Sequence, residues 1–231
     1  MGGAWQGRRE RSYLEGTGAT EDAVHAPRSA VPTAQGFVLK GALSFREHAT
    51  ARQRRLAAAV RSAVLVRVPE AEAVVGEWRW QYTLDAPAGM PAHVTILFPF
   101  VEPARLGEVE ERLAQIVAGT PAFDVTFARA ARWPEILYLE PEPAEPFVAL
   151  TRAIEREWPD QPPYGGTHET IVPHLTVAES ADPAVLDGAL ASVEPQLPVA
   201  TRAREASLFV EDHAGHWHEH SRLPFGHSGV A

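Results

Sequence analysis

From residue 62 onward, the chain alternates between two kinds of hydrophobic pattern. In short segments apolar and polar residues alternate, as in strands with one buried face, and in longer segments an apolar residue recurs every three or four positions, as on the buried side of a helix. The expected strands are 62–69, 93–98, 123–132, 136–141, 174–180, 200–212 and 217–225. The expected helices present four apolar faces: Val74, Val75, Trp78 and Tyr82; Leu106, Val109, Leu113, Ile116 and Val117; Phe147, Leu150, Ile154 and Trp158; and Val185, Leu186, Leu190 and Val193.

These elements form the same series twice, in the order strand, helix, strand, helix, strand. Such internal repetition predicts two similar units related by an approximate two-fold axis. At the start of the last helix, Asp182 and Pro183 are typical of an N-cap and a first helical position. We therefore expect an α+β domain over residues 62–231, with lobes contributed by about 62–132 and 133–225.

The first 61 residues have a different composition. Residues 1–35 are rich in Gly, Ala, Ser and Thr without a helical or strand period, which predicts a disordered extension, and 36–61 are expected to form a basic linker with a helix over 44–61. This helix is either a solvated linker or a contact to nucleic acid. The net charge is +5 over residues 1–61 and −14 over 62–231. Because nucleic-acid affinity comes mostly from Lys and Arg, the acidic domain argues against binding a long duplex; a small nucleotide or an RNA end is easier to accommodate.

Several classes of protein are excluded by what the sequence lacks. There is no cysteine, so disulfides, thiolate metal sites and a cysteine nucleophile are ruled out. No apolar run is long enough to span a membrane, and the first residues lack the apolar block of a signal peptide. We expect a cytoplasmic location, and the sequence does not indicate the oligomeric state.

Two of the expected strands begin with the same motif, His–x–Thr followed by an apolar residue. His93 and Thr95 start one strand, His174 and Thr176 start another, and each motif follows a proline. In a strand, residues two apart share a face, so each His and its Thr point together away from the core. The motifs occupy equivalent positions of the two repeats, which predicts that they meet in a joint site.

The chemistry that suits two facing imidazoles is phosphoryl transfer. Displacement at phosphorus is in line, so one group takes a proton from the attacking oxygen while another gives a proton to the leaving oxygen. Histidine can be neutral in one copy and protonated in the other near neutral pH. The hydroxyls of Thr95 and Thr176 can donate hydrogen bonds to the non-bridging phosphate oxygens.

The two motifs, their separation of 81 residues and the duplicated layout resemble the 2H phosphoesterase superfamily, in particular the bacterial 2′-5′ RNA ligase-like proteins. The resemblance covers about residues 62–225. It implies a bilobal α+β fold in which two antiparallel sheets face each other across a central cleft. It also implies a phosphodiesterase that acts, without a metal cofactor, on 2′,3′-cyclic phosphates or 2′-5′ phosphodiesters of nucleotides or RNA ends. His93 and His174 would be the acid and base, and Thr95 and Thr176 the phosphate binders. We assign the base to His174 and the acid to His93, although the two motifs are symmetric in sequence.

Three further residues are expected to bind substrate. Arg67 and Tyr138 lie on strand faces that are expected to line the cleft, Arg67 near the phosphate and Tyr138 near a base, and Tyr164 precedes the second motif, where it can stack on a base. Two alternatives stay open: a nucleotide or RNA-end binding protein without catalysis, and a metal hydrolase. The metal hydrolase would use the C-terminal histidines, which are His213, His216, His218 and His220.

Overall fold

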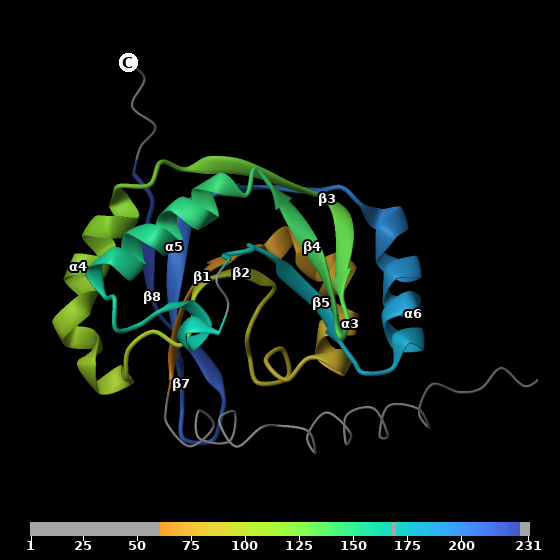
Figure 1. Ribbon diagram of the computed structural model, residues 1–231, viewed down its shortest axis with the longest axis horizontal. Helices are drawn as coiled ribbons and strands as arrows, with labels where there is room; N and C mark the ends of the chain where they lie inside the picture. Colours follow the sequence, from red (N-terminus) through yellow and green to blue (C-terminus); the bar gives the residue numbers. More distant parts are fainter. Residues whose placement is uncertain (1–60, 168–169, 227–231) are drawn as a thin grey trace, which may run out of the picture. The chain divides into compact units, whose positions relative to one another are not determined.

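Two four-stranded antiparallel sheets form the framework of the protein in a computed structural model that describes residues 61–167 and 170–226 (Figure 1). The first sheet has the strand order β2-β1-β7-β8, with β1 (Ser62–Arg67), β2 (His93–Leu97), β7 (Glu205–Glu211) and β8 (Trp217–Pro224). The second has the order β5-β4-β3-β6, with β3 (Phe123–Trp133), β4 (Ile136–Glu142), β5 (Leu175–Glu179) and β6 (Val199–Ala203). The expected α+β fold with two antiparallel sheets is therefore confirmed. The segments expected over 1–35 and 36–60 lie outside the described residues.

The two sheets repeat one another strand by strand. β2, β1, β7 and β8 occupy the same places in the first sheet as β5, β4, β3 and β6 in the second. The chain leaves the first sheet after β2 and returns to it at β7, so the second sheet is built from the continuous segment 123–203 and the first from 62–97 together with 205–224. The sheets therefore do not follow the expected division at residues 132 and 133, because the third strand of each repeat pairs in the sheet of the other.

The segment 200–212, expected as one strand, is two strands. β6 pairs with β3 and β7 pairs with β1, and only Arg204 lies between β6 and β7. At this junction Arg204 and Glu205 lie between the buried Ala203 and Ala206, so the alternation breaks where the chain changes sheet.

Helices cover the outer faces of the two sheets in pairs (Figure 1). α4 and α5 contact each other and lie against β8 and β2 of the first sheet, whereas α3 and α6 contact each other and lie against β5 and β4 of the second. Most of their buried residues are those expected from the apolar periodicity, but Arg79 of α3, Thr151 of α5 and Ala189 of α6 are also buried. The Asp182 side chain caps α6 by accepting a hydrogen bond of 2.9 Å from the backbone nitrogen of Ala184. The helices are α3 (Glu72–Tyr82), α4 (Leu106–Ala118), α5 (Glu145–Glu157) and α6 (Pro183–Val193). Short 3-10 helices are η2 (Pro69–Ala71), η3 (Pro103–Arg105), η4 (Pro163–Gly166) and η5 (Glu194–Gln196).

A bulge follows each His–x–Thr motif at the same place. In the pairing of β1 with β2, Leu65 lies opposite Thr95 and Val64 opposite Leu97, which leaves Ile96 as an extra residue. In the pairing of β4 with β5, Tyr138 lies opposite Thr176 and Leu137 opposite Ala178, which leaves Val177 extra. An extra residue shifts the alternation of side chains between the two faces of a strand.

Within the described residues, no helix is long and apolar enough to cross a membrane.

Candidate active site

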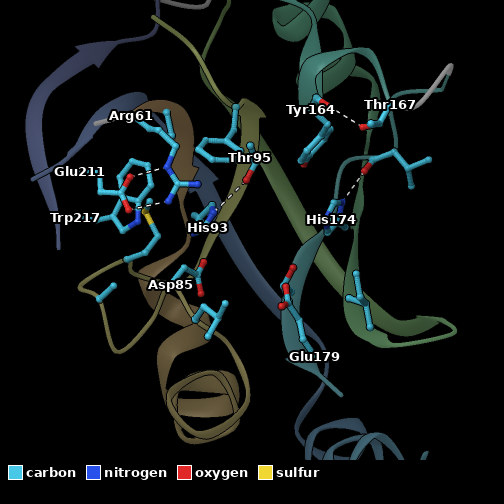
Figure 2. Close-up of a pocket in the computed structure, with 18 of the residues that line it drawn as sticks. Arg61, Asp85, His93, Thr95, Tyr164, Thr167, His174, Glu179, Glu211 and Trp217 are labelled. Carbon is cyan, nitrogen blue, oxygen red and sulfur yellow. Dashed lines mark hydrogen bonds and ion pairs between the residues drawn. The ribbon is translucent and has the colours of Figure 1, made fainter. Parts of the chain in front are cut away.

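A cavity of about 1120 Å³ lies between the inner faces of the two sheets (Figure 2). Both histidines and both threonines of the two motifs line it, with His93 and Thr95 on the first sheet, Thr176 on the second and His174 immediately before β5. The expected cleft between two facing sheets is thus present, and the structure brings the four motif residues together. Beyond the motifs, the wall includes Arg61, Asp85, Tyr164, Glu179, Trp133 and Trp217.

The first motif holds its imidazole by a backbone contact. Nδ1 of His93 lies 2.7 Å from the carbonyl oxygen of Pro91, and Nε2 lies 3.1 Å from Oγ1 of Thr95. A carbonyl oxygen only accepts, so Nδ1 carries the proton and donates it, and Nε2 keeps its lone pair and accepts from the Thr95 hydroxyl. The imidazole is therefore oriented with a basic nitrogen next to a hydroxyl group in the cavity.

The second motif holds its imidazole by the same kind of backbone contact. Nδ1 of His174 lies 2.8 Å from the carbonyl oxygen of Val172, two residues earlier, just as Pro91 lies two residues before His93. The same reasoning places a proton on Nδ1, which leaves Nε2 as the nitrogen that can gain or lose the second proton. The rings of Trp133 and Tyr138 pack edge-on against the His174 ring, at centroid distances of 4.8 and 5.6 Å. Both imidazoles thus carry a proton on Nδ1 and have a fixed orientation.

His93 is held in its neutral form. Burial lowers its pKa to about 4, the positive charge of Arg79 and the nearby His174 lower it as well, and Asp85 and the Pro91 carbonyl oppose the shift only in part. At neutral pH the imidazole is therefore unprotonated, as a proton acceptor must be. The influence of His174 on this pKa also indicates that the two histidines are close enough to interact electrostatically.

Arg79, on α3, connects the two motifs from behind. Its side chain is only 1% exposed, and its guanidinium donates to the carbonyl oxygens of Thr176 at 2.9 Å and Pro91 at 3.2 Å, and to Asp85 at 3.2 Å. Pro91 is also the acceptor for His93, so one buried cation supports both histidine strands. Sequence analysis missed this residue, although it lies four positions after Val75 and so shares the buried face of the helix.

Two carboxyl groups line one end of the cavity. Asp85 accepts from the Thr83 hydroxyl at 2.6 Å; burial raises its pKa, but Arg79, His93 and the hydrogen bonds lower it further, so the net shift is downward. Burial and the charge of Asp85 raise the pKa of Glu179 to about 7, and Arg79 offsets this only in part. Sequence analysis also missed Glu179, because strict alternation after Thr176 would turn it toward the helices and only the bulge turns it inward.

Tyr164, in η4, lies where the sequence placed it, in the wall of the cavity. Its backbone has a positive φ of 52°, and its nitrogen donates to the carbonyl oxygen of Phe98 at 2.7 Å. Burial raises the pKa of its phenol, whereas a hydrogen bond with Thr95 lowers it. The tyrosine is therefore hydrogen-bonded to Thr95 of the first motif, and it precedes the second motif in the sequence.

Arg67 and Tyr138 do not line the cavity. Arg67 lies opposite His93 in the pairing of β1 with β2, but its guanidinium reaches Glu205 at 2.7 Å and Glu219 at 3.3 Å, so its charge is neutralised within the sheet. Tyr138 is 6% exposed and packs against Trp133 with the two rings tilted by 35°, where it supports His174. Both residues are on the expected strand faces, but neighbouring side chains cover them, and strand periodicity does not indicate depth.

The other end of the cavity is aromatic. The Arg61 guanidinium lies over the rings of Phe98 and Trp217, at 5.2 and 5.7 Å from their centroids, and makes a two-pronged ion pair with Glu211 at 2.5 and 2.7 Å. The sequence pattern assigns Arg61 to the basic linker, whereas the structure places it in the cavity wall. Its charge is already paired, so this end offers mainly flat apolar surface.

The C-terminal histidines do not converge on one point. His218 and His216 approach Asp212 at 3.0 and 3.7 Å, whereas His220 lies 3.3 Å from Glu110 on α4. Across 61–167 and 170–226, no three His, Asp or Glu side chains are grouped so that they could hold a metal ion. The row of histidines therefore gives no support to a metal hydrolase.

Fold and site together define a class of two-sheet α+β proteins in which paired His–x–Thr strands face one cavity. The sequence model of the 2′-5′ RNA ligase superfamily matches residues 67–215. The chain therefore belongs to this superfamily, and the resemblance to the 2H phosphoesterases is confirmed.

Solved structures share the fold at low sequence identity. E. coli LigT complexed with 3′-AMP is 16% identical with a TM-score of 0.50, over 72% of this chain and 98% of LigT. The protein TT0787 of Thermus thermophilus is 17% identical, also with a TM-score of 0.50, over 73% of this chain and 99% of that protein. A search of curated proteins finds no match. At these identities the likeness concerns the fold alone.

Proposed function

We propose that the protein is a phosphodiesterase that opens the 2′,3′-cyclic phosphate or the 2′-5′ phosphodiester of a nucleotide or an RNA end. The main support is that two imidazoles, each held through Nδ1 by a backbone carbonyl and each with its threonine, line one cavity. The acid and base are side chains, so the reaction is proposed to need no metal. A small nucleotide is the proposed ligand class, and the fold relative LigT has been crystallised with 3′-AMP.

In the proposed reaction, Nε2 of His93 accepts a proton from water as the water oxygen attacks phosphorus. The opposite P–O bond breaks, and the leaving ribose oxygen takes a proton from Nε2 of His174, which enters this step as the doubly protonated imidazolium and keeps its Nδ1 proton on the Val172 carbonyl. Thr95 and Thr176 donate hydrogen bonds to the non-bridging oxygens, where negative charge develops. These roles reverse the assignment made from sequence, because the low pKa of His93 keeps it neutral and suits it to accept a proton.

The proposal predicts that either histidine is needed for turnover. His93→Ala and His174→Ala should each lower kcat/KM on a 2′,3′-cyclic nucleotide by more than about 100-fold, because each removes one proton transfer. His218→Ala is a matched control, since this histidine is exposed on β8 outside the cavity. The assay is run with and without EDTA, which should not change the rate.

The outcome separates the remaining alternatives. Near-parental rates in both alanine variants would overturn the proposed roles. Nucleotide binding by calorimetry, with no product after hours on cyclic phosphates or 2′-5′ dinucleotides, would instead indicate a binding protein without catalysis.

A further inference from the structure

The equivalent positions three residues after each motif threonine carry very different side chains. These positions are Phe98 and Glu179, and both line the cavity because the bulge before each of them shifts the strand alternation. Phe98 packs edge-on against Trp217 at 6.0 Å, which gives its end of the cavity an apolar surface. Glu179 places a carboxyl group in the corresponding place of the other sheet. The approximate symmetry of the cavity is therefore broken at these two residues.

The negative charge of Glu179 is not balanced by the residues around it. Its side chain has no hydrogen bond with any residue in the described part of the chain. Among those same residues, the only cation that influences it is Arg79, which is already bound to Asp85 and to three backbone carbonyls. Two carboxyl groups thus share one guanidinium. A second phosphate would be repelled at this end, whereas a group that donates hydrogen bonds would satisfy the carboxylate.

The walls around Glu179 suit a flat ring. Ile136 lies opposite Glu179 in the pairing of β4 with β5, and Trp133, Ile136 and Leu84 all line the cavity. Figure 2 shows Glu179 on β5 beneath His174, with Asp85 across the cavity from it. At a rise of about 3.3 Å per residue, Glu179 lies about 10 Å along the strand from Thr176. That separation is comparable to the distance between the phosphate and the base edge of a nucleotide.

We propose that Glu179 is a specificity-determining residue that selects a guanine base in the substrate. This inference rests on the proposed phosphodiesterase function and names the substrate class of the same cavity. Among the common bases, guanine alone presents two adjacent N–H donors, N1–H and the N2 amino group, which match the two oxygens of a carboxylate. Uracil presents one donor between two carbonyl oxygens, which a carboxylate repels, and adenine and cytosine each present one amino group.

The test compares guanosine and inosine 2′,3′-cyclic phosphates, which differ only in the N2 amino group. The wild-type protein should show a kcat/KM for guanosine about 10- to 150-fold above that for inosine, the range expected for the loss of one hydrogen bond to a charged group. Glu179→Gln keeps the shape but replaces one acceptor with a donor, so the ratio should fall to near one. Glu111→Gln, an exposed carboxyl on α4 outside the cavity, is the matched control and should keep the wild-type ratio.

Two results would overturn the inference while leaving the phosphodiesterase in place: equal rates on both substrates in the wild type, or an unchanged ratio in Glu179→Gln. If no cyclic phosphate is hydrolysed, the proposed function fails, and calorimetry with guanosine and inosine 3′-monophosphates applies the same comparison to binding. Tighter binding of the guanosine nucleotide that is lost in Glu179→Gln would then uphold the role of Glu179. Equal binding would refute it.

Discussion

At the scale of single residues, the site depends on carboxyl and imidazole groups whose titration is shifted by burial. His93 is held neutral, and Glu179 is held close to half ionisation near neutral pH. Neither state can be read from the sequence, because each is set by neighbours that come from other elements. The two motif histidines themselves were predictable, since a polar pair at every second position of an apolar strand must point away from the core.

The ionisation of Glu179 should make stability depend on pH. Its ordinary pKa of 4.5 is raised to about 7 in the folded protein, so the unfolded chain ionises first and stability falls as the pH rises from 4.5 to 7. Glu179→Gln removes this penalty, and we expect it to unfold at higher urea concentration than the wild type at pH 8. The gain should be about 1 to 3 kcal/mol at pH 8 and should shrink toward pH 5.

Urea titrations of the wild type, Glu179→Gln and the Glu111→Gln control at pH 5 and pH 8 measure this difference. A gain of the same size at both pH values would show that ionisation of Glu179 is not its source.

At the scale of elements, helix α3 both covers the second sheet and sets the electrostatics of the site. Arg79 is the link, because it reaches the β5 backbone at Thr176 and the segment before β2 at Pro91. Sequence periodicity predicted the helix and its apolar residues, but the predicted buried face did not include Arg79. A buried arginine among apolar neighbours is stable only because carbonyl and carboxylate groups surround it, and these groups come from distant parts of the chain.

Replacing Arg79 should change the pH profile of catalysis as well as stability. Arg79→Met removes the positive charge beside His93, so the pKa of His93 should rise toward its ordinary value and the acidic limb of the kcat/KM profile should move to higher pH. The loss of its hydrogen bonds should also lower the free energy of unfolding by about 3 to 5 kcal/mol. Arg79→Lys keeps the charge, so its acidic limb should stay near that of the wild type.

Rates measured from pH 4 to pH 8 on the three proteins decide the point. If the acidic limb lies at the same pH in Arg79→Met and in the wild type, Arg79 has only a structural role.

At the scale of the whole molecule, the order of elements was predictable and their pairing was not. The strands and helices follow from local periodicity, which each segment carries in its own residues. Pairing depends on which edges meet after folding, and an alternating pattern fits either sheet equally well. This is why β3 and β7 were placed in the wrong halves, and why Arg67 and Tyr138 were expected in a wall that other side chains occupy.

The observed pairing predicts that residues 61–132 cannot fold alone. In this fragment β1 lacks its partner β7, and β3 lacks both β4 and β6. We expect the isolated fragment to show no cooperative thermal unfolding by circular dichroism, in contrast to a fragment of residues 61–226 prepared in the same way. A cooperative transition in the shorter fragment would contradict the pairing.

The junction between β6 and β7 limits how the cavity can change its width. Arg204 alone joins the two sheets there, and its carbonyl oxygen accepts a hydrogen bond of 2.8 Å from the nitrogen of Phe225, just after β8. The other connection, from β2 to β3, runs through residues 98–122 and includes α4. One connection between the two sheets is a single residue and the other is much longer, so the backbone holds the sheets together at Arg204. We therefore expect any change in the separation of the two sheets to be smallest next to Arg204.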